Sequence, residues 1–178
     1  QSGQPAGNVT LSGGLLQVNG GVSSTNGSQF EWGNFNVNVL SNAITSVISG
    51  RIRIRQDSFS TLPFTVARGA TNGTDLLVSA AITESAASGI SKAGSGLMLL
   101  TATNTYSGPT TISGGTLQVG STQALGINSD VTLSNAAGVL LNLTNFNTTI
   151  DALAGGGTAG GNITLGTATL TIGAANGT

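Results

Sequence analysis

A nine-residue stretch that occurs twice constrains the fold of this chain more than any other feature. Residues 10–18, TLSGGLLQV, return as residues 111–119, TISGGTLQV, with seven identities in nine. A weaker echo, TLS, follows at 132–134. Short strands that return about every 20 residues are typical of a solenoid, in which one turn alone cannot bury its apolar side chains but a stack of turns buries a continuous core.

Around these echoes the chain alternates short apolar strands with turns rich in glycine, asparagine and serine. No dozen-residue window repeats apolar positions at helical spacing. Ile52 and Ile54 alternate with arginines, and Val37 and Val39 with asparagines, so one set faces inward and the other outward. The sequence therefore predicts an all-β parallel β-helix, with an antiparallel β-sandwich as the alternative. At about 4.8 Å per turn, roughly nine turns would make a rod ~40 Å long.

We expect one continuous solenoid over residues 1–178. The chain has no initiator Met, and we interpret it as part of a larger or processed protein. A solenoid places apolar residues of every turn in a single long core. Its expected members are Leu11, Val18, Met98, Leu100, Ile112, Leu117, Leu133 and Leu141.

The composition restricts the chemistry that the chain can perform. Only 6% of its residues are charged, and it has no Cys and no His. Disulfides, thiolate metal sites, cysteine nucleophiles and imidazole bases are therefore excluded. A net charge of −1 gives no basic surface for nucleic acid. No apolar run approaches the roughly 18 residues of a transmembrane helix, so we expect no membrane span.

The most specific motif lies within residues 89–120, GISKAGSGLMLLTATNTYSGPTTISGGTLQVG. This stretch resembles the autotransporter-associated β-strand repeat, also called the passenger-associated transport repeat. The residues that match that family's pattern are Gly89, Ile90, Lys92, Gly94, Gly96, Met98, Leu100, Asn104, Tyr106, Gly108, Thr110, Thr111, Gly115, Thr116 and Leu117. The resemblance extends over residues 72–178, whereas residues 1–71 are divergent N-terminal turns. It implies a right-handed parallel β-helix in a long secreted or surface-attached bacterial protein.

The chain departs from the family pattern at two outward positions. Met98 and Leu100 occupy the inward leucine positions of the family, so Leu97 and Leu99 face outward by alternation. The family usually places small polar residues there. Outward leucines form an apolar patch suited to lateral self-association.

The carboxylates show no enzyme-like cluster. Polysaccharide-degrading β-helix enzymes need grouped carboxylates, but no two here lie closer than nine positions in sequence. Stacked turns could bring Asp57 close to Asp75, and Asp130 close to Asp151, yet aspartates commonly cap turns. We therefore expect no catalytic residue, no bound metal and no cofactor.

Arg51, Arg53 and Arg55 form the one charge cluster, on one face of one strand. They could contact an anionic glycan or lipopolysaccharide, or they could serve solubility and protection of a strand edge. Phe30 and Trp32 share a strand face too, and we interpret them as core packing or an end plug rather than a sugar-stacking platform.

These observations predict a structural segment of a secreted or cell-surface bacterial protein, such as a stalk, extracellular fibre or adhesin passenger, rather than an enzyme. The alternatives are a glycan- or host-surface-binding module and, third, a polysaccharide-degrading β-helix enzyme. Neither end of the chain carries an amphipathic capping helix, and few charges keep copies apart. We therefore expect end-to-end stacking, on neighbouring turns of a longer chain or on other copies, with lateral contact through Leu97 and Leu99.

Overall fold

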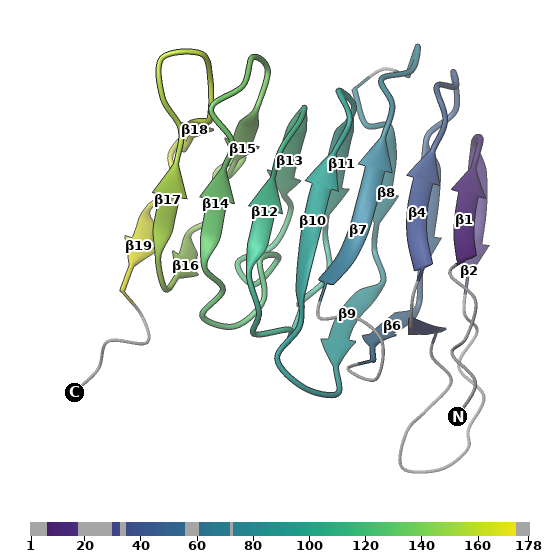
Figure 1. The fold of residues 1–178 in the computed structure, drawn as a ribbon, viewed down its shortest axis with the longest axis horizontal. Helices are drawn as coiled ribbons and strands as arrows, with labels where there is room; N and C mark the ends of the chain where they lie inside the picture. The colour runs from purple at the N-terminus through teal and green to yellow at the C-terminus, as the bar shows by residue number, and fades with distance from the viewer. Residues whose placement is uncertain (1–6, 18–29, 33–34, 56–60, 72, 174–178) are drawn as a thin grey trace.

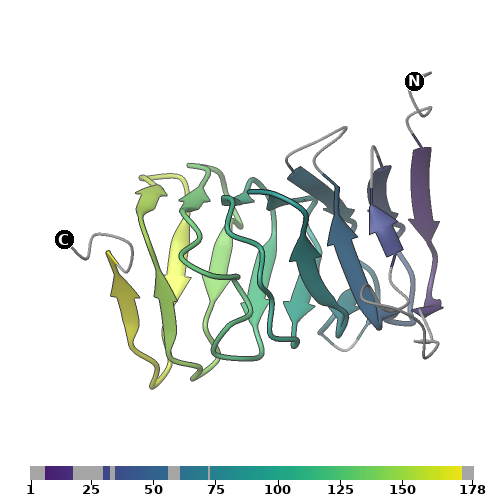
Figure 2. The ribbon, with the colours of Figure 1, turned by 90° about the horizontal axis from the view of Figure 1, so that it is seen from below.

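The chain forms a parallel β-helix whose turns follow one another along the long axis of the molecule (Figures 1 and 2). The computed structural model describes residues 7–17, 30–32, 35–55, 61–71 and 73–173. All strand pairings in this part of the chain are parallel. The expected β-helix is therefore confirmed, and the antiparallel sandwich is excluded. No helix in the described residues is long and apolar enough to cross a membrane.

Two seven-stranded sheets run along the molecule, and each turn contributes one strand to each sheet. The first sheet consists of β1 (Gly7–Leu11), β4 (Phe35–Val39), β7 (Thr61–Val66), β10 (Gly89–Ala93), β12 (Thr110–Ile112), β14 (Val131–Leu133) and β17 (Leu153–Gly155). The second sheet consists of β2 (Gly14–Gln17), β5 (Ser46–Ser49), β8 (Leu76–Val78), β11 (Leu97–Leu100), β13 (Thr116–Val119), β15 (Leu140–Asn142) and β18 (Asn162–Thr164).

In the residues that the structure describes, the third side of the coil carries strands towards its two ends but not in its middle. The strands of this third side are β3 (Phe30–Trp32), β6 (Arg51–Ile54) and β9 (Ala81–Glu84) in one sheet, and β16 (Thr148–Ile150) and β19 (Leu170–Ile172) in another. Between β9 and β16, residues 101–109 and 120–130 contain no strand. The third side is thus interrupted in the middle of the molecule.

The turns are of unequal length. The sequence separation of paired residues shows this in the first sheet. It is larger between Val9 of β1 and Val37 of β4 than between Ile112 of β12 and Leu133 of β14. The short period expected from the echoes therefore holds only in the C-terminal half. Nine turns were expected, whereas each long sheet has seven strands in the described part of the chain. The two halves of the echo nevertheless occupy equivalent corners, β1–β2 and β12–β13.

One apolar core runs through the stack, as the alternation predicts. Six of the expected core residues are at most 2% exposed: Met98, Leu100, Ile112, Leu117, Leu133 and Leu141. Leu11 is partly buried against the same core. Val18 lies outside the described residues, as do the side chains of Phe30 and Trp32.

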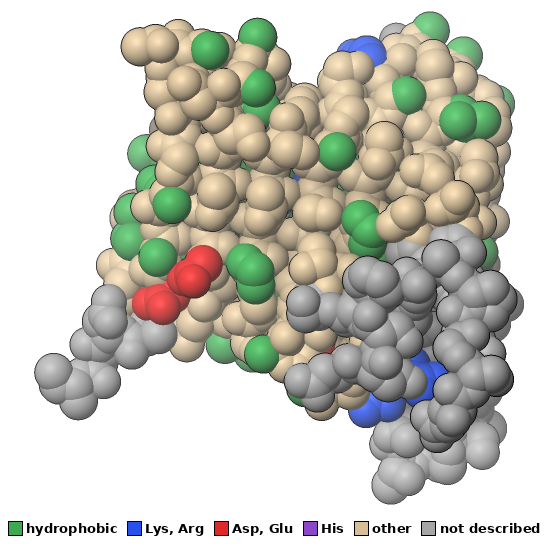
Figure 3. Space-filling view, in the orientation of Figure 1, with side chains coloured by type: hydrophobic (Ala, Val, Ile, Leu, Met, Phe, Trp, Pro, Cys, Tyr) green, Lys and Arg blue, Asp and Glu red, His purple; other side chains and the backbone are tan. Residues whose placement is uncertain are grey.

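The outer face of the first sheet is formed by small polar side chains. Ser91, Thr111 and Thr132 are in register on consecutive strands and point outward. Figure 3 shows this face as mostly polar side chains and backbone, with charged groups mainly towards its margins. Hydroxyls and amides rather than charges therefore cover this surface.

Consecutive turns lie close together at the corner before β13. Gly115, which precedes β13, has a φ of +60°, and a Cβ at this position would lie 2.5 Å from the carbonyl oxygen of Gly96 in the preceding turn. Both the backbone conformation and the close contact therefore require glycine.

We predict that Gly115→Ala lowers the free energy of unfolding by at least about 3 kcal/mol, because strain and collision add. Gly138→Ala is the matched control, since Gly138 has a similar φ of +78° but no atom within 4 Å of its added Cβ. The control should cost only about 1–2 kcal/mol. Urea denaturation measures both, and equal losses would contradict the close packing at this corner.

Candidate functional site

Buried polar side chains in the middle of the stack bind to groups in neighbouring turns. We call these hydrogen bonds the inter-turn contacts; they are made by Asp75, Lys92, Asn104, Thr110 and Ser129. A buried polar group needs a partner to offset the loss of water. In a coil of stacked turns that partner comes mostly from the turn above or below.

Lys92 lies on β10 and is fully buried. Its Nζ donates to the carbonyl oxygens of Ala93 at 3.0 Å, Gly94 at 2.8 Å and Gly114 at 2.9 Å. These three acceptors match the three protons of an ammonium group. Because Gly114 belongs to the next turn, Lys92 ties two corners together.

Burial lowers the pKa of Lys92 from its ordinary 10.5 to about 8, and the negative charge of Asp75 opposes part of this change. A lysine with a low pKa can serve as a base or nucleophile where a substrate reaches it. Here the amine is enclosed and directed at backbone carbonyls. Its geometry is that of a structural contact.

Asn104 replaces strand pairing on the interrupted third side. Its side chain accepts a hydrogen bond from the Ile82 N–H at 2.8 Å and donates to the Ala124 carbonyl at 2.6 Å. These partners lie in the preceding and the following turn. One amide side chain, 1% exposed, thus joins three consecutive turns where residues 101–109 form no strand.

A chain of buried hydroxyls lies next to Asn104. The Tyr106 hydroxyl is 2.9 Å from Thr110 Oγ1, which is 2.9 Å from Ser129 Oγ, and Ser129 donates to the Gly108 carbonyl at 2.8 Å. Burial raises the pKa of Tyr106 well above its ordinary value, although the hydrogen bond with Thr110 acts in the opposite direction. Tyr106 therefore stays neutral and serves as a core residue with one polar tip.

Asp75 fixes the loop before β8 to the second sheet. Its carboxylate accepts hydrogen bonds from the backbone N–H groups of Leu97 at 2.7 Å and Gly69 at 2.8 Å, from the Thr71 hydroxyl at 2.9 Å and from Arg68 at 2.9 Å. Burial by itself would raise the pKa of Asp75, but these hydrogen bonds hold it below its usual value. The carboxylate caps a turn, as the sequence interpretation of the aspartates expected.

The aspartate pairs considered from the sequence lie only partly within the described residues. Asp57 lies outside the described residues. Asp130 and Asp151 lie in consecutive turns, where the Asp151 N–H donates to the carbonyl of Ser129 at 3.2 Å. Within the described ranges, no three His, Cys, Asp or Glu side chains are grouped so that they could hold a metal ion.

The arginine cluster lies on the outer face at β6. Arg51 and Arg53 belong to this strand, and Arg55 directly follows it. Arg51 and Arg55 are exposed and Arg53 is half-buried, while Ile52 and Ile54 point into the core. The alternation read from the sequence is therefore confirmed. Contact of these arginines with an anionic ligand stays a prediction.

Leu97 and Leu99 face outward and are half-buried on the second sheet. Leu99 is in register with Leu77, Leu77 with Val47, and Val47 with Leu15. These residues form an outward aliphatic row across β11, β8, β5 and β2. Sequence reasoning missed the row because each member comes from a different turn, at a spacing that changes from turn to turn.

Comparison with known proteins identifies the central stretch. Residues 90–119 match the family model described as Passenger-associated-transport-repeat. The Adhesin BmaC autotransporter of Brucella suis biovar 1 (strain 1330) is 47% identical over 87 residues. These are 49% of this chain but 2% of the relative, so the chain spans a small fraction of the length of the curated relative it matches. No solved structure matches.

We predict that Lys92→Met lowers the free energy of unfolding by about 2–4 kcal/mol, because methionine keeps the apolar stem but leaves three buried carbonyls without a donor. Arg51→Met is the control; it removes an exposed positive charge and should change stability by less than about 0.5 kcal/mol. Urea denaturation near pH 7 compares the two, and losses of similar size would contradict the role assigned to Lys92.

Wild type and Lys92→Met should also differ in their pH dependence. The folded chain releases the Lys92 proton near pH 8 and the unfolded chain near pH 10.5. Between these values the unfolded state binds more protons, so the free energy of unfolding rises with pH. Lys92→Met lacks this contribution, and the stability gap between wild type and variant should widen from about pH 8 to about pH 10. A gap that stays constant or narrows would show that burial does not lower the pKa of Lys92.

Proposed function

We propose that this chain is a segment of an autotransporter passenger, secreted or located at the bacterial cell surface, and that it serves as a stiff stalk without enzymatic activity. The proposal rests on one observation: in the middle of the stack, the buried polar groups of each turn are satisfied by the turns next to it. Backbone ladders and inter-turn contacts then act along the same axis. A segment built this way resists bending and local opening, because opening one turn leaves polar groups unpaired in the next.

The chemistry of the titratable groups supports a non-enzymatic role. Lys92, Asp75 and Tyr106 have clearly perturbed pKa values, and all three are bonded to protein groups in the interior of the stack. Perturbed groups in an enzyme are instead directed at a cleft. In this chain the pKa shifts arise from burial and from contacts within the protein.

Two features support association with further turns or further copies. In the described part of the chain, β1 and β17 are the edge strands of the first sheet, and edge strands present unpaired backbone groups that another strand can complete. The outward aliphatic row ending at Leu99, with Leu97 beside it, offers apolar surface for lateral contact. We propose end-to-end stacking at the edges and sideways bundling through Leu97 and Leu99.

Light scattering across a concentration series tests both contacts. The chain should grow in mass with concentration, and Leu97→Thr/Leu99→Thr should remove the bundles while leaving linear assemblies. Leu40→Thr/Ile44→Thr is the matched control, because these leucine and isoleucine side chains are 50% and 66% exposed at another place. A chain that stays monomeric at every concentration would reject stacking. Bundles that persist in the leucine variant, or that vanish equally in the control, would reject the lateral contact.

A second candidate function is binding of an anionic surface glycan by β6. Its support is the placement of three guanidinium groups on one outward face, with the isoleucines between them turned inward. Retention on a sulfated-glycan array that is lost in Arg51→Ser/Arg53→Ser would support this candidate. Equal retention of the variant would reject it.

A further inference from the structure

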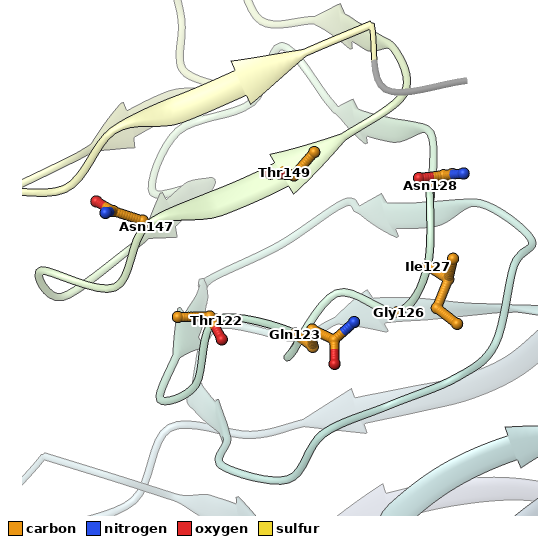
Figure 4. A pocket seen from close by; sticks show the side chains of 7 residues that line it. All are labelled: Thr122, Gln123, Gly126, Ile127, Asn128, Asn147 and Thr149. Carbon is orange, nitrogen blue, oxygen red and sulfur yellow. The ribbon is translucent and has the colours of Figure 1, made fainter. Parts of the chain in front are cut away.

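The interruption of the third side leaves a hollow between residues 122–128 and β16. Its volume is about 390 Å³. Figure 4 shows the side chains around it, which come from the turn after β13, from Asn147 just before β16 and from Thr149 in the middle of β16. The residues that bear on its chemistry are Thr122, Gln123, Ile127, Asn128, Asn147 and Thr149.

The hollow exists because residues 122–125 form a tight turn at the place where other turns of the β-helix have a third-side strand. On its N-terminal side this segment is bonded to the preceding turn: the Asn104 N–H donates to the Gln123 carbonyl at 3.0 Å, and the Ile127 N–H to the Tyr106 carbonyl at 2.9 Å. On its other side, within this described stretch, no hydrogen bond joins residues 122–127 to residues 147–149. Strand pairing on the third side resumes only at β16 and β19.

The backbone of β16 faces the hollow at one residue. The Thr148 N–H donates to the Thr169 carbonyl at 3.0 Å, and the Ile150 carbonyl accepts from the Gly173 N–H at 3.2 Å. In a parallel ladder, alternate residues direct their N–H and C=O groups to opposite sides. Thr149 therefore directs its N–H and C=O away from β19 and towards residues 122–128.

The side chains around the hollow are neutral hydrogen-bonding groups. Gln123, Asn128 and Thr149 are exposed, and in the described part of the chain none of their side chains has a protein hydrogen-bond partner. Asn147 uses its Oδ1 to accept from the Thr169 N–H at 2.9 Å, which leaves its Nδ2 donor available. Ile127, 43% exposed, adds an apolar surface, and no charged residue lines the hollow.

We propose that this hollow binds one or two residues of a neutral oligosaccharide. Sugar hydroxyls both donate and accept hydrogen bonds, as amides and threonine hydroxyls do, and the C–H face of a sugar ring suits an aliphatic side chain. The volume lies at the lower end of the range of about 300–1,000 Å³ for ligand sites. An extended peptide fits less well, because strand addition requires a row of backbone groups along a strand and on β16 only Thr149 directs its backbone groups to the hollow.

Titration of the isotope-labelled chain with neutral tetrasaccharides of N-acetylglucosamine, glucose and mannose, followed by NMR, tests the proposal. At least one of them should produce saturable shifts of the side-chain amides of Gln123 and Asn128 and of the Thr149 N–H. Gln123→Ala/Asn128→Ala should weaken that affinity at least tenfold. Asn162→Ala, which removes an exposed amide from β18, and Arg51→Ser/Arg53→Ser should leave it unchanged.

Because the two substituted amides are exposed and unbonded, the remaining spectrum of the double variant should match that of the wild type. The proposal is overturned if none of the three sugars shifts these resonances, or if the double variant binds as well as the wild type. It is also overturned if a hexapeptide of alternating valine and threonine shifts the Thr149 N–H while the sugars do not, since that result identifies strand addition. None of these outcomes depends on whether the chain acts as a stalk.

Discussion

The hydrogen bond from one turn to the next is the interaction on which the rest of this structure depends. Parallel strands stacked about 4.8 Å apart satisfy their backbone groups only through the neighbouring turns. The first and second sheets meet this requirement with regular ladders across their seven-stranded lengths. On the third side the ladder stops between β9 and β16, and the side chain of Asn104 bonds both adjoining turns there.

Residues of the passenger-associated repeat motif make several of these contacts between turns. At Lys92, Asn104, Thr110 and Gly115 one turn bonds to or closely meets another, and Tyr106 supports Thr110 by a hydrogen bond within its own turn. Replacing Lys92 or Asn104 by an apolar residue would leave buried carbonyl or N–H groups without a partner, which costs more than the lost bond itself. The glycine has no alternative either, since the carbonyl of the preceding turn occupies the space that a side chain would need. The positions at which the fold requires one particular residue are therefore concentrated at contacts between turns.

Local geometry was predictable from the sequence, and register between turns was not. The inward placement of Met98 and the outward placement of Leu99 follow from strand alternation, and the structure has them so. The described part of the chain has fewer turns than expected because the N-terminal turns are longer than the C-terminal ones, and no local pattern marks that length. Lys92 was recognised as a motif residue, but its burial was not inferred, although it shares the inward phase of its strand with Ile90. The hollow beside Thr149 gives no local signal, because it arises where a strand is missing and not from any residue present.

Native-state hydrogen exchange across residues 90–133 tests most directly whether the inter-turn contacts make these turns one mechanical unit. We predict that the slow amide protons of β10, β11, β12, β13 and β14 exchange through a shared opening, with one free energy and one denaturant dependence. Strands that open one by one, each with its own free energy and denaturant dependence, would contradict this cooperative behaviour.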